Sequence, residues 1–191
     1  MDNNVMFKIS YGLYVLTAKD GEKSNGCIIN TLQQVTVSPN RISIAVNKTN
    51  LTHDMIMDSR KFNISILSEK ATFDIFKHFG FQSGRDTDKF ADYPAETAAN
   101  GIPYIIEGAN SYLSGNVIST VDLGTHTMFI ADVEDGKSLS EDNISTSKKF
   151  LSSRQKKDGY VRSVAMYIKV KSFQPISYAH CVSMARLTLK K

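Results

Sequence analysis

The chain has 191 residues, of which 41% are hydrophobic and 22% are charged. This length is enough for one well-buried core and gives little reason to expect two full domains. No apolar run is long enough to span a bilayer, and the first residues lack the basic-then-apolar pattern of a secretory signal. We therefore expect a cytoplasmic protein with no membrane partner. Cys27 and Cys181, far apart in the sequence, make no disulfide framework.

The formal net charge of +4 is unevenly distributed along the sequence. From Lys156 onward there are eight basic residues and one acidic residue, Asp158. Of the totals of 23 basic and 19 acidic residues, this leaves 15 and 18 before Lys156. The body of the protein is therefore mildly acidic, which argues against a nucleic-acid partner.

In chain order, short stretches rich in β-branched and aromatic residues alternate with turn signals, as in antiparallel sheets. The pair Asp20-Gly21 predicts a hairpin, and Ser38-Pro39-Asn40 predicts a break before a strand that alternates with period two. Predicted strands cover residues 11–18, 27–37, 41–46, 62–67, 104–107, 112–121 and 126–134.

Two short helices interrupt these strands. Asn50 or Thr52 can cap the first helix, which runs through Met57, and residues 71–81 form an amphipathic helix that ends near Gly80. Residues 83–103 are polar and are expected to form a loop. Many short strands with two helices predict a mainly β protein, with three successive antiparallel strands at the start of a closed barrel.

The turn NKTNLTHD after the third strand carries anion-binding chemistry. Lys48 offers a cation, its neighbours offer amides and hydroxyls, and the start of a helix presents free N–H groups. These groups fit a phosphate. The alternative is that Asn50 or Thr52 caps the helix and Lys48 is solvated. In the strand INTLQQVT, amides and hydroxyls suit the polar edge of a flavin or pyrimidine ring, and the alternative there is an exposed strand face.

Taken in order, these segments resemble the flavin reductase family with the FMN-binding split β-barrel fold. The resemblance rests on SNGCIINTLQQVT, NKTNLTHDMI, FNISIL, GFQSGRDTDKF and LGTHTMFIADVEDG, and it covers residues 1–155 as one flavin reductase-like domain. It implies an FMN-dependent oxidoreductase that forms a homodimer with FMN at the interface. It also implies that NAD(P)H supplies the hydride.

The resemblance assigns site residues to this sequence. His126 would be catalytic, because it would steer the nicotinamide or protonate reduced flavin. The alternative is a histidine on an exposed strand. The family pattern has small hydroxyl residues after Thr31, whereas this sequence has Leu32, Gln33 and Gln34. The residues expected to bind the cofactor are Asn30, Thr31, Leu32, Gln33, Gln34, Asn47, Lys48, Asn50, Thr52, His53, Arg85 and Lys89.

The flavin would carry the difficult chemistry, so no nucleophile and base pair is needed. The choice between NADH and NADPH stays open, because no G-x-G-x-x-G follows a strand. The electron acceptor would be a redox partner such as rubredoxin or a flavodiiron protein, or diffusible flavin. The alternative function is a non-enzymatic barrel that binds FMN or another ligand.

The segment 156–191 is an irregular basic tail that lacks the periodicity of a domain. In multidomain members of the family, a rubredoxin begins with DGYVC-x-x-CG, and here DGYV is not followed by Cys. If the gene is read in a shifted frame after about Val161, codons can be chosen that encode two Cys-x-x-Cys knuckles. Three residues of that shifted translation are Val, Leu and Gly whichever codons the gene uses. We therefore expect a frameshift remnant of a rubredoxin domain, with no iron site in this chain. The alternative is a native basic tail.

Overall fold

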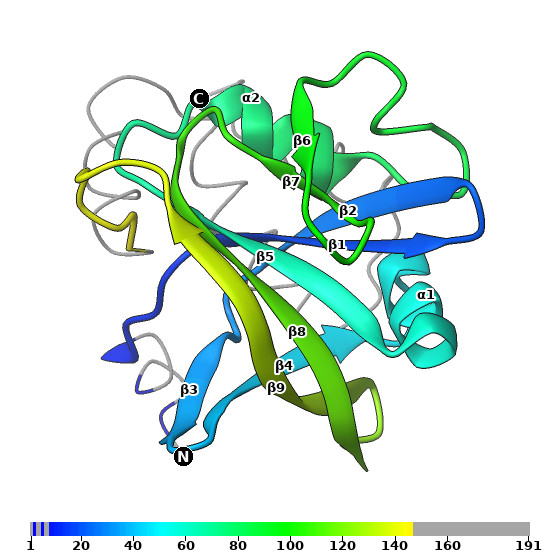
Figure 1. The fold of residues 1–191 in the computed structure, drawn as a ribbon, viewed down its shortest axis with the longest axis vertical. Coiled ribbons are helices and arrows are strands. Elements are labelled where there is room, and N and C mark those ends of the chain that lie inside the picture. The colour runs from blue at the N-terminus through cyan, green and yellow to red at the C-terminus, as the bar shows by residue number, and fades with distance from the viewer. Residues whose placement is uncertain (1, 3–4, 6–7, 147–191) are drawn as a thin grey trace. The chain divides into compact units, whose positions relative to one another are not determined.

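A computed structural model describes residues 2, 5 and 8–146, which fold mainly into β-strands with a few helical turns (Figure 1). The large sheet is antiparallel, in the order β2-β1-β5-β8-β9-β4-β3, and a second sheet pairs β6 with β7. The strands are β1 (Tyr14–Asp20), β2 (Lys23–Ile29), β3 (Gln33–Val37), β4 (Asn40–Asn47), β5 (Lys61–Leu67), β6 (Ala95–Thr97), β7 (Pro103–Ile105), β8 (Ala109–Asp122) and β9 (His126–Ser138). The helical elements are α1 (Leu51–Ser59), α2 (Phe73–Phe76) and the π-helix η2 (Lys77–Phe81). The predicted mainly β fold is confirmed.

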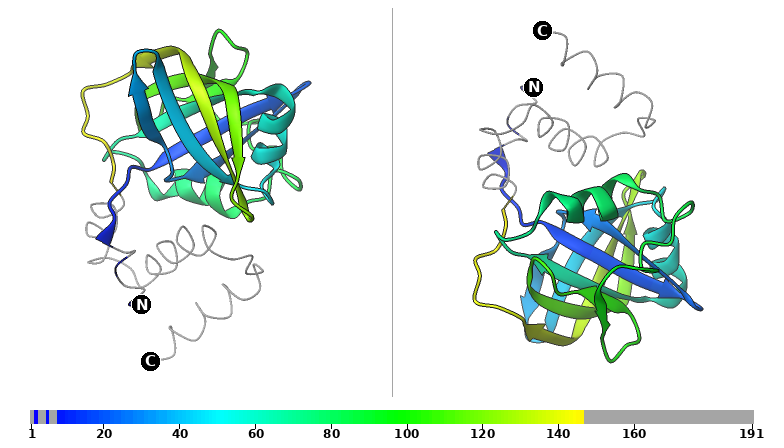
Figure 2. Two further views of the ribbon diagram at one scale, coloured as in Figure 1. Left: turned by 90° about the horizontal axis from the view of Figure 1, so that it is seen from below. Right: turned by 90° about the horizontal axis from the view of Figure 1, so that it is seen from above.

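The large sheet curls around one hydrophobic core (Figure 2). Its two edge strands, β2 and β3, share no ladder within the described residues, so the predicted closed barrel is an open, curled sheet. This arrangement is consistent with a split barrel. The predicted hairpin at Asp20-Gly21 is confirmed, with Asp20 paired to Lys23 and Gly21 at a φ of 54°.

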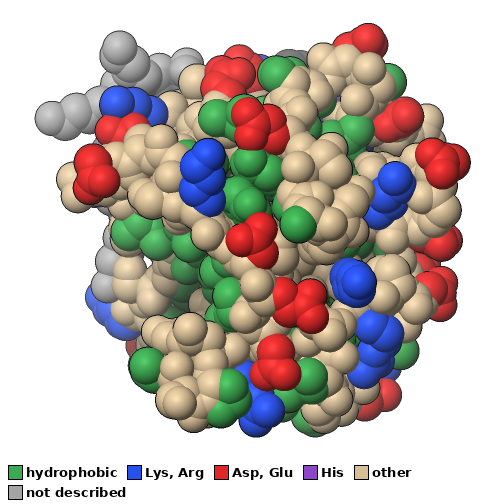
Figure 3. All heavy atoms as spheres, in the orientation of Figure 1, with side chains coloured by type: hydrophobic (Ala, Val, Ile, Leu, Met, Phe, Trp, Pro, Cys, Tyr) green, Lys and Arg blue, Asp and Glu red, His purple; other side chains and the backbone are tan. Residues whose placement is uncertain are grey.

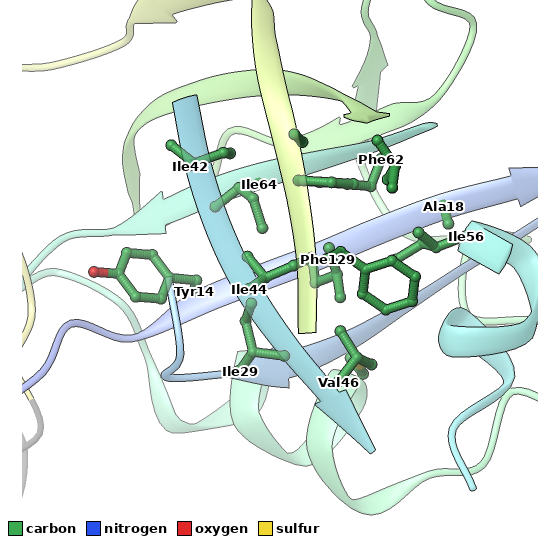
Figure 4. Packing of buried hydrophobic residues seen from close by; sticks show 14 of the residues in the cluster. Tyr14, Ala18, Ile29, Ile42, Ile44, Val46, Ile56, Phe62, Ile64 and Phe129 are labelled. Carbon is green, nitrogen blue, oxygen red and sulfur yellow. The ribbon is translucent and has the colours of Figure 1, made fainter. Parts of the chain in front are cut away.

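The core is built from alternate residues of the strands, because successive side chains of a strand point to opposite faces. In β4, burial alternates along the whole strand, as predicted, and β9 supplies Phe129 and Ala131 from the same side. Figure 4 shows these side chains converging with residues of the other sheet half and of α1. The labelled residues are Tyr14, Ala18, Ile29, Ile42, Ile44, Val46, Ile56, Phe62, Ile64 and Phe129.

The predicted strand 27–37 is wrong in its continuity. It breaks after Ile29 and resumes at Gln33, so β2 and β3 lie at opposite edges of the sheet. The intervening Thr31 uses its hydroxyl to bond the backbone of Ala45, donating to its carbonyl at 2.7 Å and accepting from its N–H at 3.1 Å. A side-chain bond to β4 therefore replaces strand pairing at this crossing, and the three successive antiparallel strands are two separate hairpins.

The first helix begins after Asn50, one of the two predicted caps, and ends with Arg60 in the left-handed conformation. The second predicted helix, 71–81, starts later, at Phe73, and widens into a π-helix from Lys77. Gln82 then returns to extended backbone. Phe76 at the end of α2 and Phe79 in the π-helix are both buried, and the Phe79 ring contacts Phe90 and Tyr93 of the following loop.

The segment 83–103, predicted to be a loop, also contains β6 and the start of β7. Buried polar groups of the main sheet hold it in place, since Asn63 donates to the Ile102 carbonyl at 2.8 Å and Thr17 donates to the Pro103 carbonyl at 2.6 Å. Thr17 and Asn63 are themselves fully buried, and these bonds give their polar groups partners.

Acidic and basic side chains lie among one another on the face shown in Figure 3, with hydrophobic side chains between them. Among residues 2, 5 and 8–146, no helix is both long and apolar enough to cross a membrane. The compact unit described here ends at Thr146. The predicted boundary at residue 155 and the predicted frameshift remnant both lie outside the described residues.

Candidate functional site

The outward face of β4 forms the floor of the candidate site. Ile42, Ile44 and Val46 point into the core, so the alternate side chains Ser43, Ala45 and Asn47 point outward. These side chains are short and partly exposed.

Two segments that are distant from each other in sequence border this floor. Thr31 is bonded to Ala45, Gln33 pairs with Ser43, and His126 of β9 pairs with Asn47. The structure therefore brings together three predicted site residues around one strand.

The turn after β4 closes one end of this face. The side-chain oxygen of Asn47 accepts hydrogen bonds from the N–H and the hydroxyl of Thr49, both at 2.9 Å, which shapes the turn. The Lys48 backbone N–H donates to the Thr125 carbonyl at 3.1 Å, and the Lys48 ammonium forms an ion pair with Asp122 at 2.7 Å. This ion pair, with the Gly124 N–H, lowers the pKa of Asp122.

The N-terminus of α1 follows directly, and it lacks a side-chain cap. Asn50 occupies the cap position, yet its side chain makes no capping hydrogen bond. The N-terminal turn of a helix presents N–H groups and a partial positive charge. Asn47, Lys48 and Asn50 therefore form a connected turn with the donor chemistry of a phosphate site.

Thr52 and Asn25 form a buried pair behind this turn. Thr52 is fully buried, and its hydroxyl accepts a hydrogen bond from the Asn25 amide at 2.9 Å. The Asn25 side-chain oxygen is buried without a hydrogen-bond partner among the described residues. Gly84 lies against it so closely that a Cβ at Gly84 would stand 2.1 Å from this oxygen. The contact holds the loop after η2 against β2.

His53 is buried at the start of α1, and both ring nitrogens have partners. Nδ1 lies 3.1 Å from the Asp54 carboxylate and Nε2 lies 2.9 Å from the Thr127 hydroxyl. Arg85 donates to the other Asp54 oxygen at 2.6 Å. Partial burial of Asp54 favours its neutral form, but hydrogen bonds from Arg85 and His53 outweigh burial and lower its pKa. An ionised carboxylate only accepts, so the Nδ1 of His53 carries the proton.

His126 lies at the first position of β9, partly exposed, with Nδ1 2.9 Å from the Thr125 hydroxyl. Burial and, to a smaller extent, the nearby His53 lower the pKa of His126 below its ordinary 6.5. The imidazole is therefore neutral at neutral pH and can both donate and accept a hydrogen bond.

Lys89 has a different environment from the other predicted cations. It is 3% exposed, and its ammonium donates to the carbonyls of Gly26 at 2.7 Å and Phe79 at 3.1 Å. His78 donates to the Lys89 carbonyl at 2.7 Å and stacks on Tyr93. These contacts tie the loop after η2 to β2 and to the π-helix.

The remaining predicted residues follow the break between β2 and β3. Leu32 packs against the core, Gln34 is exposed in the edge strand, and Asn30 is partly buried. The predicted site thus divides into an outward face on β4 and a buried network around α1, joined by the contact between His53 and Thr127.

The sequence analysis did not predict Asp122 and Asp54, which pair with the exposed cations Lys48 and Arg85. It also did not predict Asn25 and Thr127, the partners of the buried residues Thr52 and His53. Asp54 directly follows His53 in the sequence, and this adjacency was the one local indication that the two side chains interact. Asp122 lies 74 residues from Lys48, and no local pattern relates them.

Most of the chain matches a known protein family. The family described as flavin reductase like domain matches residues 6–156. A high molecular weight rubredoxin of Moorella thermoacetica is 40% identical over 139 residues, which are 73% of this chain and 61% of that protein. The chain therefore spans less than two thirds of that relative.

Two further proteins are similar over most of their length. A ferric-chelate reductase (NAD(P)H) of Archaeoglobus fulgidus is 32% identical over 76% of this chain and 86% of its own. The solved NADH:FAD oxidoreductase of Streptomyces globisporus superposes with a TM-score of 0.68 at 22% identity, covering 75% of this chain and 84% of its own. The latter likeness concerns the fold.

Proposed function

Because the chain belongs to the flavin reductase-like family, we propose that it binds FMN and accepts hydride from NAD(P)H, then passes the electrons to an acceptor. The observation that carries this proposal is the gathering of Thr31, the turn after β4 and His126 around one outward strand face. Bound flavin would supply hydride acceptance and electron transfer, so the protein has to bind, orient and tune it.

The donor set of the turn fits a phosphate. Lys48 supplies a cation, Asn47 and Asn50 supply amides, and the uncapped start of α1 supplies N–H groups. Asp122 holds the Lys48 ammonium at 2.7 Å, so a phosphate would have to compete with this carboxylate or share the ammonium with it. The same holds for Arg85, which pairs with Asp54.

Each remaining residue has a distinct part in this proposal. Thr31 and Gln33 border the face where a flat ring would lie, and neutral His126 would donate or accept one hydrogen bond there. Thr52, His53 and Lys89 are buried with protein partners and would support the site from behind.

The phosphate contact is tested by comparing FMN with riboflavin, which lacks the phosphate. Flavin fluorescence quenching should show tighter binding of FMN, and Lys48→Ala should weaken FMN by about 10- to 100-fold, because a hydrogen bond to a charged group contributes about 1.5–3 kcal/mol. Riboflavin affinity should not change. Lys77→Ala is the matched control, since Lys77 also forms an exposed ion pair, with Asp74. Equal loss of FMN and riboflavin affinity in Lys48→Ala would place the phosphate elsewhere.

We also propose that the chain acts as a homodimer. The edge strand β3 is exposed along its whole length and carries Val35 and Val37, and the end of β8 exposes Val121. Exposed apolar groups beside the site suit a second copy. Val37→Asp should shift the sedimentation coefficient to that of a monomer, and a protein that is monomeric before the change would contradict this proposal.

We further propose an electron acceptor and an origin for the segment after about Val161. A redox partner such as rubredoxin is supported by the relative named high molecular weight rubredoxin. We propose that the segment after about Val161 arose from a shifted reading frame. Nucleotide sequence across Tyr160 decides this point, since a shifted frame without Cys-x-x-Cys would exclude it.

A further inference from the structure

Four hydrogen-bonded side chains cross the molecule from the loop after η2 to β9. Arg85 contacts Asp54 at 2.6 Å, Asp54 contacts His53 at 3.1 Å, and His53 contacts Thr127 at 2.9 Å. Two of the four are buried, His53 at 8% and Thr127 at 7% exposed, whereas the side chains of Asp54 and Arg85 are partly exposed. The His53 ring also packs edge-on against Phe129, with ring centroids 5.6 Å apart.

A polar chain in such surroundings has an energetic cost unless every group is paired. Both nitrogens of His53 are paired, so the ring is held in one orientation from two sides. Removing one partner leaves the other buried and unsatisfied, which destabilises the fold. The paired ring is therefore suited to hold α1, which carries His53, in a fixed position relative to Thr127 of β9.

His53 and Thr127 both lie beside the candidate site. The His53 N–H donates to the Asn50 carbonyl, so His53 belongs to the first turn of α1, directly after the proposed phosphate turn. Thr127 adjoins His126 in β9, and His126 pairs with Asn47 at the start of that turn. Backbone bonds fix the turn from the β4 side, and the contact between His53 and Thr127 fixes it from the helix side.

We propose that His53 and Thr127 are positioning residues, which hold the first turn of α1 and the turn before it at a fixed distance from His126. This inference rests on the proposed function, because that function gives the turn and His126 their roles. Neither residue has to touch the flavin. Their effect would reach it through the placement of the groups that do.

The electrostatic setting of His126 follows from the same arrangement. His53 faces it from α1, Lys48 and Asp122 lie at the adjoining ends of β4 and β8, and Asp54 lies behind His53. If His53 loses its anchor on β9, the pKa of His126 should move toward its ordinary value of 6.5. This readout needs no bound flavin.

The test removes the hydroxyl of Thr127 and compares the effect with removal of another buried threonine hydroxyl elsewhere in the fold. Thr127→Val keeps the shape of the side chain, and Thr127→Ser keeps the hydroxyl. Thr17→Val is the control, because Thr17 is also buried and also donates a hydrogen bond, to the Pro103 carbonyl at 2.6 Å. The measurements are the NMR titration of His126 without flavin, FMN affinity, the pH profile of turnover and the thermal midpoint.

We expect Thr127→Val and Thr17→Val to lower the thermal midpoint alike. Only Thr127→Val should shift the His126 titration and weaken FMN by about tenfold, the equivalent of one lost hydrogen bond, and Thr127→Ser should restore both. Identical His126 titrations in Thr127→Val and Thr17→Val would overturn the inference. If the unaltered protein binds no flavin, the proposed function fails, and the titration still decides whether His53 and Thr127 position His126.

Discussion

The contact between Gly84 and Asn25 gives a sharp prediction for Gly84→Ala. The added Cβ would lie 2.1 Å from the Asn25 side-chain oxygen and 2.4 Å from its Cγ, far inside any normal contact. Asn25 is 3% exposed and bonded to Thr52, so it cannot turn toward solvent without breaking that bond. Either Asn25 or the loop that carries Arg85 has to move.

The cost can be estimated from these two routes. Overpacking costs about 1–3 kcal/mol, and a buried polar group that loses its partner costs about 1–3 kcal/mol. We therefore expect Gly84→Ala to lower the free energy of unfolding by about 1–3 kcal/mol in urea titrations, whichever of the two routes relieves the clash. FMN affinity should fall as well, because the loop that bears Arg85 is displaced.

Gly80→Ala is the matched control from the same region. A Cβ at Gly80 would meet Ile28 at 3.5 Å, which is an ordinary contact, so this variant should be near neutral. In an Asn25→Ala background, Gly84→Ala should cost at least about 1 kcal/mol less, because the clashing atoms are gone. Equal stabilities of Gly84→Ala and Gly80→Ala would refute the reasoning.

Two further predictions concern stability. Lys89→Met should lower the free energy of unfolding by about 2–4 kcal/mol, because the carbonyls of Gly26 and Phe79 lose a charged donor. The control is Lys61→Met, which lies at an exposed position and should change the free energy of unfolding little. Equal effects of the two substitutions would contradict a structural role for Lys89. The hydrogen bond from Tyr104 to Glu96, with burial, raises the pKa of Tyr104 to about 12 from 10.0. Because the folded state holds this proton more tightly, the contribution is complete below pH 10 and is lost as the pH rises toward 12. Between pH 10 and 12, the thermal midpoint of Tyr104→Phe should therefore fall less steeply with pH than that of the unaltered protein. Parallel plots of midpoint against pH for the two proteins would contradict this prediction.

Local pattern was enough to predict the elements whose burial alternates regularly. The alternation in residues 41–46 predicted β4, and the amides near Lys48 predicted the start of α1, because both signals are contained within a few residues. The break at Thr31 was not predictable, since it depends on a hydroxyl bond to Ala45, 14 residues away. The widening of the second helix into a π-helix leaves the same apolar residues on its buried side, so periodicity cannot reveal it.

The candidate site also contains residues that a local motif indicates and contacts that only the fold creates. Lys48, Asn50 and Thr31 were predicted as site residues because their side-chain chemistry is visible in short motifs. The ion pair of Arg85 with Asp54 joins residues 31 apart, and the pairing of His126 with Asn47 depends on the sheet order. Burial of Thr52 and His53 depends on how α1 packs against the sheet, which no local motif encodes.

Anaerobic addition of NADH or NADPH to the flavin-loaded protein tests the central claim most directly. The proposed oxidoreductase predicts that the yellow absorbance band of the flavin bleaches with at least one of the two nucleotides and returns when an acceptor such as rubredoxin is added. Flavin that binds tightly but stays oxidised with both nucleotides would contradict the claim and would indicate a non-enzymatic flavin-binding barrel.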